Sequence, residues 1–157
     1  MMEYQRLDTG MTLQQGLEEY YASRDDLKQG RGLSLPGKEF FRCHDTVHVV
    51  FGYNTELPSE AGVKMWSFFG TDAGLRRLYQ GYRLEESKEI YTSLRFRQIV
   101  DAGTKALVIV PRVILQSFKM KKRWPWSDFD DYLSTPLASI REEFGIVLVR
   151  ISPHASG

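Results

Sequence analysis

Apolar residues recur at helical spacing along the first third of the chain. Within residues 12–29 they lie three or four positions apart, and Thr12 and Gly30 are suitable boundary residues for a helix. A turn-rich connector follows at 31–37, after which residues 38–52 carry a second apolar stripe. The pattern therefore predicts two amphipathic helices in this part of the chain.

The remainder of the chain also favours helices, separated by Gly and Pro. Gly52 is a suitable end for the second helix, and Pro58 is typical of the first turn of a third. Residues 146–151 fit either a short strand or an apolar tail. We also expect a helix at 58–69, followed by irregular structure with a short helix at 70–84. A helix at 85–110 would be interrupted near Gly103, and Pro111 would kink or break its continuation to Met120. Two short helices at 127–133 and 136–144 complete the pattern, the second closed by Gly145.

Length and composition fit one domain. A chain of 157 residues with 42% hydrophobic side chains can bury a sizeable core, so we predict a mainly α, single compact multi-helix domain over residues 1–157. The 21 Lys and Arg nearly balance the 20 Asp and Glu, which provides no basic footprint for nucleic acid. The single cysteine, Cys43, lies in an apolar run and is interpreted as a small buried hydrophobe in a reducing compartment.

Two features bear on cellular location. Residues 1–10 show neither a secretion-signal nor a transit-peptide pattern. The longest apolar run, 106–118, contains Pro111 and Arg112 and is shorter than the roughly 20 residues that a membrane span needs. We therefore expect a cytoplasmic protein with no membrane-spanning segment.

Two histidines and an aspartate share one face of the second predicted helix. His48 lies one turn beyond His44 and Asp45 is one residue around, so the three side chains fall within about 100° of arc. Two imidazoles at this spacing typically bind a metal ion, and a carboxylate beside them either binds the ion or orients an imidazole. Since little of this helix is expected to face solvent, these polar groups need mutual satisfaction, which a metal ion provides.

A further ligand must come from another element. A turn at 52–58 would bring Glu60 back alongside the histidines, and Glu56 is the competing candidate. The mixed nitrogen and oxygen set suits zinc best, with magnesium, manganese or iron as alternatives. The sequence therefore predicts a divalent metal site at His44, Asp45, His48 and Glu60, and an open coordination position would make the metal catalytic.

Each of these residues also has a plain structural interpretation. Glu60 alone would stabilise a helix N-terminus, His48 would be a hydrogen-bonded core histidine, and His44 with Asp45 would be an isolated buried pair. A metal phosphohydrolase of the His-Asp type is disfavoured, because it needs further ligands and the only other histidine is His154.

The same residues resemble the signature of a known family. The string His44-Asp45-Thr46-Val47-His48, followed after eleven residues by Glu60, is similar to the His-Asp-x-x-His and downstream Glu of the coenzyme Q biosynthesis protein 4 family. The similarity covers most of the chain. It extends to Gly52, to Glu60-Ala61 with Lys64 and Trp66 along the next helix, and to the stretch 133–141 that leads to Gly145-Ile146.

The resemblance implies a helical fold with an apolar cavity for a polyprenyl chain, and a role in ubiquinone biosynthesis. The implied activity is that of a metal-dependent lyase, the oxidative decarboxylation of a polyprenylated hydroxybenzoate ring. The alternative is a non-catalytic prenyl-lipid-binding or scaffold protein of the quinone biosynthetic complex. Expected partners are a prenylated quinone precursor or other isoprenoid lipid, the inner membrane face peripherally, a second copy of the chain and other quinone-biosynthesis proteins.

Three further groups of residues are candidates for contact with substrate or membrane. Lys64 and Arg141 are candidate substrate-binding residues, although a structural ion pair is the commoner role of such an arginine. The candidate lining of the lipid cavity is Trp66, Phe68, Phe69, Leu107, Ile109, Val113 and Ile114. The basic and aromatic run of Lys119, Lys121, Lys122, Arg123, Trp124 and Trp126 is typical of a membrane-interface contact and equally of a solvated helix end.

Overall fold

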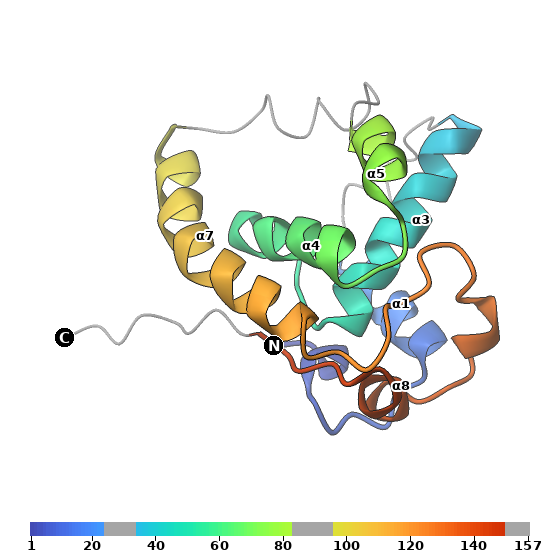
Figure 1. Cartoon of the computed structure of the whole chain (residues 1–157). Helices are drawn as coiled ribbons and strands as arrows, with labels where there is room; N and C mark the ends of the chain where they lie inside the picture. Colours follow the sequence, from blue (N-terminus) through green and yellow to red (C-terminus); the bar gives the residue numbers. More distant parts are fainter. Residues whose placement is uncertain (24–33, 83–95, 150–157) are drawn as a thin grey trace.

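A computed structural model describes residues 1–23, 34–82 and 96–149. The described residues form a mainly helical domain, as the sequence predicts (Figure 1). Its elements are the 3-10 helix η1 (Glu3–Gln5), the α-helices α1 (Leu13–Ala22), α3 (Leu35–Val50), α4 (Leu57–Phe69), α5 (Leu75–Tyr82) and α7 (Phe96–Ser117), the 3-10 helix η2 (Asp130–Tyr132) and the helix α8 (Leu137–Phe144).

Helix α1 begins where the sequence predicts, because Thr12 caps it. The Thr12 side chain accepts the Gln15 N–H at 3.2 Å, and the Gln15 side chain accepts the Thr12 N–H at 2.9 Å. Gly16 then allows α1 to lie close to α3, since a Cβ at this position would meet the Val49 side chain at 2.7 Å. The helix ends at Ala22, and the predicted continuation beyond residue 23 lies outside the described residues.

Helix α3 begins earlier than predicted. The Ser34 hydroxyl accepts the Gly37 N–H at 3.2 Å and Pro36 occupies the first turn, so residues 35–37, expected in a connector, are helical. At the other end, Gly52 has a φ of 73°, which turns the chain away from the helix axis as predicted. Helix α4 follows, in agreement with the predicted helix at 58–69.

Helix α7 runs without a break, which corrects the predicted interruption near Gly103 and the break at Pro111. Pro111 cannot donate to the Leu107 carbonyl, but both residues are exposed, so water can satisfy that carbonyl. The helix packs along α4 and ends at Ser117, short of Met120 (Figure 1). Residues 85–95 of the predicted helix lie outside the described residues.

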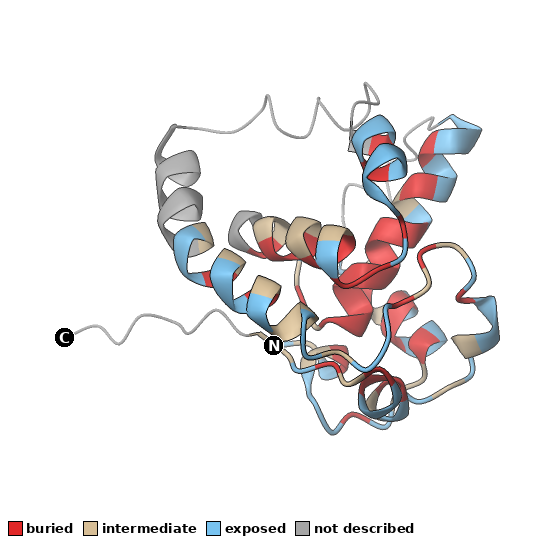
Figure 2. Cartoon of the chain, viewed as in Figure 1, coloured by how far each residue is buried: buried red, intermediate tan, exposed pale blue. Residues whose placement is uncertain are grey.

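The core is centred on α3, every residue of which from Cys43 to Val50 is buried (Figure 2). Burial raises the pKa of the Cys43 thiol to about 11, in keeping with its interpretation as a small hydrophobe. Trp124 and Trp126 also belong to this core, so their assignment to a membrane interface is wrong. The nearby Lys122 pairs with Glu143 at 2.5 Å on the surface.

Two predicted features are not confirmed. The candidate cavity residues do not line one common space: Trp66, Ile109 and Val113 are fully packed core residues, whereas Leu107 is 78% exposed. Residues 146–149 form neither helix nor strand, and the rest of the candidate C-terminal strand lies outside the described residues. Among the described helices, none combines the length and apolar composition that spanning a bilayer requires.

Arg141 holds three parts of the chain together. Its buried guanidinium donates to the carbonyls of Tyr4 and Arg6, at 2.6 Å each, and to those of Val49 at 3.0 Å and Val50 at 2.9 Å. Burial lowers the pKa of Arg141 to about 10, so it stays cationic at neutral pH. These bonds satisfy the last carbonyls of α3, and they make Arg141 a structural residue.

We expect Arg141→Met to lower the free energy of unfolding by about 3–5 kcal/mol, because buried carbonyls lose their donors. Urea unfolding followed by circular dichroism measures this change. Arg76→Met, on an exposed arginine of α5, is the control and should have little effect. A loss below about 1 kcal/mol at Arg141 would show that water replaces the guanidinium.

Candidate metal centre

The α3–α4 connection brings three predicted ligands together. His44 and His48 lie one turn apart on α3, and Glu60 lies in the first turn of α4. The Tyr4 hydroxyl anchors the connection by donating to the Tyr53 carbonyl at 2.8 Å. Gly62 lets α4 approach it, since a Cβ there would meet the Tyr53 ring at 2.6 Å.

The side chains of His44, His48 and Glu60 converge. Nε2 of His48 lies 3.1 Å from Oε1 of Glu60, and Nε2 of His44 lies 3.4 Å from Oε2 of the same carboxylate. The two Nε2 atoms are 3.3 Å apart. Both histidines are buried and the Glu60 side chain is 22% exposed, so the cluster faces inward with one partly open side.

These separations fit a bound metal ion. Four ligands about 2.0–2.1 Å from a tetrahedral zinc lie about 3.3 Å from one another. The cluster supplies two imidazole nitrogens and a carboxylate oxygen, a donor set found in zinc enzymes and also in non-haem iron oxygenases. The chemistry and spacing of the three residues therefore suit a divalent cation.

Asn54 orients His48 and the start of α4 together. The Asn54 carbonyl can only accept, so the 3.0 Å contact makes Nδ1 of His48 the donor and leaves Nε2 of the neutral ring free to bind an ion. The Asn54 side chain accepts hydrogen bonds from the Ser59 hydroxyl and from the Glu56 N–H at the start of α4. Asn54 thus links the second histidine to the helix that carries Glu60.

The carboxylate of Glu60 is held in its ionised form. When the imidazoles are protonated, burial still opposes ionisation of Glu60, but the charge of His48 and hydrogen bonds from both rings outweigh it, so the pKa of Glu60 lies well below its usual range. An ionised carboxylate between two imidazole nitrogens is ready to bind a cation. The competing candidate Glu56 is the exposed N-cap residue of α4 and lies outside the cluster.

Asp45 is buried beside the cluster without belonging to it. The residues whose ligand atoms all lie within 4.8 Å of one another are His44, His48 and Glu60. Oδ1 of Asp45 accepts a hydrogen bond from the Tyr20 hydroxyl at 3.2 Å. Direct ligation by Asp45 stays a prediction.

The candidate substrate-binding residues have different surroundings. Lys64 lies one turn beyond Glu60 on α4, and burial lowers its pKa while the charge of Glu60 opposes that shift. Binding of substrate by Lys64 stays a prediction. Arg141 directs its donors at backbone carbonyls, as described above, and these bonds account for its burial.

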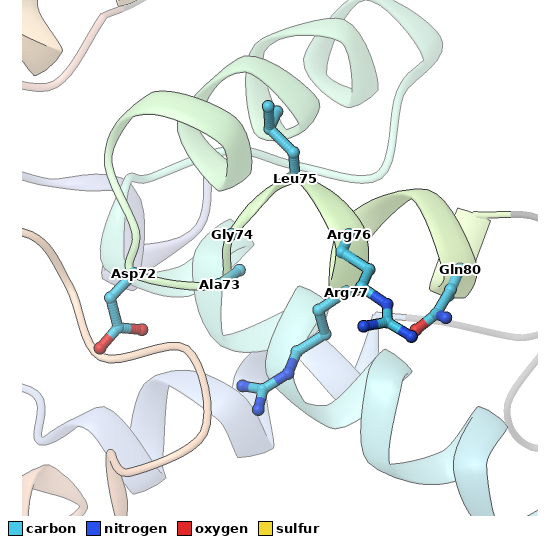
Figure 3. Close-up of a pocket in the computed structure, with 7 residues that line it drawn as sticks. All are labelled: Asp72, Ala73, Gly74, Leu75, Arg76, Arg77 and Gln80. Atoms are coloured by element: carbon cyan, nitrogen blue, oxygen red, sulfur yellow. The ribbon is translucent and has the colours of Figure 1, made fainter.

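An open pocket of about 450 Å³ lies at the start of α5 and shares no residue with the cluster (Figure 3). Arg76, Arg77 and Gln80 extend into it from the helix, and Arg77 donates to the Ser127 hydroxyl at 2.9 Å.

No protein-family model, curated protein or solved structure matches the chain.

Two contributors to the site could not be recognised in the sequence. Asn54 acts through its backbone carbonyl, which no side-chain pattern reports. Tyr20 belongs to the apolar stripe of α1, and nothing in its spacing places it against α3. Tyr20 gains its role from the packing of separate segments, and Asn54 from the turn between α3 and α4.

We expect the protein to bind one Zn²⁺ and Glu60→Gln or His48→Ala to weaken binding by roughly 100-fold or more, since loss of a ligand exceeds the 10–100-fold typical of an outer-shell change. Isothermal titration calorimetry measures the affinity. Glu56→Gln is the matched control, because it removes the same charge four residues away. Equal affinity in Glu60→Gln and Glu56→Gln would exclude Glu60 as a ligand.

Proposed function

We propose that this protein is a metal-dependent enzyme that acts on the aromatic head of a polyprenylated hydroxybenzoate in ubiquinone biosynthesis. The observation that carries the proposal is the buried cluster of two imidazoles and one carboxylate. Three protein ligands leave a coordination position open, which is the mark of a catalytic site. The resemblance of His44-Asp45-x-x-His48 and Glu60 to a quinone-biosynthesis motif supports the substrate class.

His44, His48 and Glu60 are the residues that would hold the ion, with zinc preferred and magnesium, manganese or iron as alternatives. When bound, the cation supplies a Lewis acid for the carboxylate or hydroxyl oxygen of the substrate ring. The ionised Glu60 offsets the charge of the ion. The burial of both histidines limits access of water to that side of the site.

The proposed reaction replaces the ring carboxylate by a hydroxyl group. The carbon–carbon bond to the carboxylate breaks and CO₂ leaves, while one oxygen atom of dioxygen forms the new bond to the ring carbon. A two-electron donor and two protons reduce the second oxygen atom to water. The overall balance is one aromatic acid, O₂, two electrons and two protons, which yield one phenol, CO₂ and water.

A prenylated substrate resides in a lipid bilayer, and α7 offers a surface to reach it. The helix carries exposed apolar side chains at Leu107 and Leu115, and Phe118, which is 76% exposed, follows directly after its last residue. Arg112 of the same helix is exposed, and exposed lysines follow the helix at Lys119 and Lys121. An exposed apolar stripe beside basic residues suits an anionic membrane surface, whereas the like charges of a second copy would repel.

In cells that lack the equivalent activity, we expect His48→Ala and Glu60→Ala to fail to restore ubiquinone although both variants fold. The domain draws its stability from apolar burial, so loss of the ion should leave circular dichroism and cooperative thermal unfolding intact. Glu56→Gln is the control and should restore production. Full restoration by a folded, metal-free variant would favour the non-catalytic lipid-binding or scaffold role.

Mass spectrometry of lipids that copurify with the protein tests the substrate class separately. A prenylated aromatic acid, enriched in the Glu60→Ala variant because turnover is blocked, is the result we expect. Ordinary phospholipid alone would argue against the proposed substrate.

For the membrane surface, we expect the double variant Leu107→Gln/Phe118→Gln to bind anionic vesicles about 3 kcal/mol more weakly, from about 1.5 kcal/mol for each buried apolar side chain. Co-sedimentation with phosphatidylserine-containing vesicles measures the change. Leu35→Gln/Leu75→Gln, on two exposed leucines of other helices, is the matched control. Equal partitioning of the two double variants would exclude α7 as the contact.

A further inference from the structure

Tyr20 of α1 contacts two residues of α3 at the candidate metal centre, His48 and Asp45. It is fully buried, its ring centre lies 5.1 Å from that of His48, and its hydroxyl donates to Oδ1 of Asp45 at 3.2 Å. One side chain of α1 therefore contacts a ligand of the cluster and also the buried carboxylate beside it.

The position of Tyr20 is itself fixed by packing. The Tyr4 ring meets the Tyr20 ring edge-on at 6.2 Å, and the close approach at Gly16 sets α1 against α3 one turn earlier. Glu19 ties η1 to α1 by accepting the N–H groups of Glu3 and Tyr4 at 2.9 and 3.0 Å. Tyr20 thus has little freedom to move away from His48.

The imidazole of His48 is consequently held in two directions. Nδ1 donates to the Asn54 carbonyl, which sets the rotation of the ring, and the Tyr20 ring packs against the imidazole with the two ring planes tilted by 33°. Asp45 follows His44 in the sequence and is also buried. A buried carboxylate requires hydrogen-bond donors, and the Tyr20 hydroxyl supplies one.

We propose that Tyr20 is a positioning residue for the metal centre, which holds His48 through its ring and Asp45 through its hydroxyl. This inference rests on the proposed metal site, but it does not depend on the substrate or on turnover. It holds whether Asp45 binds the ion or stays beside it, because the hydrogen bond orients the carboxylate in both cases. The role belongs to α1, which carries none of the predicted ligands.

The test compares Tyr20→Phe with Tyr132→Phe in the full chain. Both substitutions remove a tyrosine hydroxyl that donates to a carboxylate at 3.2 Å, that of Asp45 and that of Glu143 respectively. We expect Tyr20→Phe to weaken Zn²⁺ affinity about tenfold, the effect typical of residues that orient metal ligands. The visible absorption of bound Co²⁺ should also change, whereas Tyr132→Phe should keep the affinity and spectrum of the unmodified protein.

The outcomes separate the two claims. If the unmodified protein binds neither Zn²⁺ nor Co²⁺, the metal centre and this inference both fail. If it binds both ions and Tyr20→Phe has the same affinity and spectrum, the role of the hydroxyl fails, and the same result for Tyr20→Leu, which also removes the ring, overturns the positioning role as a whole. An equal loss in Tyr20→Phe and Tyr132→Phe would also overturn that role, because it would reflect general loosening. If Tyr20→Phe does not fold, Asp45→Asn replaces it, and unchanged affinity there overturns the proposal.

Discussion

Two imidazoles and a carboxylate that face one another in a largely buried space form the constraint around which this domain is arranged. Nε2 of His44 and Nε2 of His48 lie 3.3 Å apart, and the Glu60 carboxylate spans both. Because Nδ1 of His48 donates to the Asn54 carbonyl, Nε2 of the neutral ring carries a lone pair that faces the Glu60 carboxylate. A cation bound between these atoms would relieve their repulsion and satisfy both imidazoles and the carboxylate at once.

The rest of the fold holds this cluster from several sides. Arg141 of α8 binds the last carbonyls of α3, directly after His48, and joins them to the N-terminal segment at Tyr4. Asn54 connects His48 to the start of α4, and Tyr20 of α1 packs against the His48 ring. These contacts are apolar packing and side-chain hydrogen bonds that the chain itself supplies around the cluster.

The parts that the sequence predicts well are those set by local rules. The spacing of His44 and His48 places them on one helix face, and the turn after Gly52 returns the chain so that Glu60 meets them. Roles that depend on separate segments were missed, such as the ring of Tyr20 against His48. Trp124 was assigned to the surface because its neighbours are basic, yet its large apolar area is better satisfied in the core.

A crystal structure of the protein grown with Zn²⁺, with anomalous diffraction collected at the zinc edge, determines whether the cluster binds an ion. We expect one strong anomalous peak about 2.0–2.2 Å from Nε2 of His44, Nε2 of His48 and a carboxylate oxygen of Glu60. A structure with no peak between these residues, or with Glu60 turned away from both histidines, would contradict this expectation.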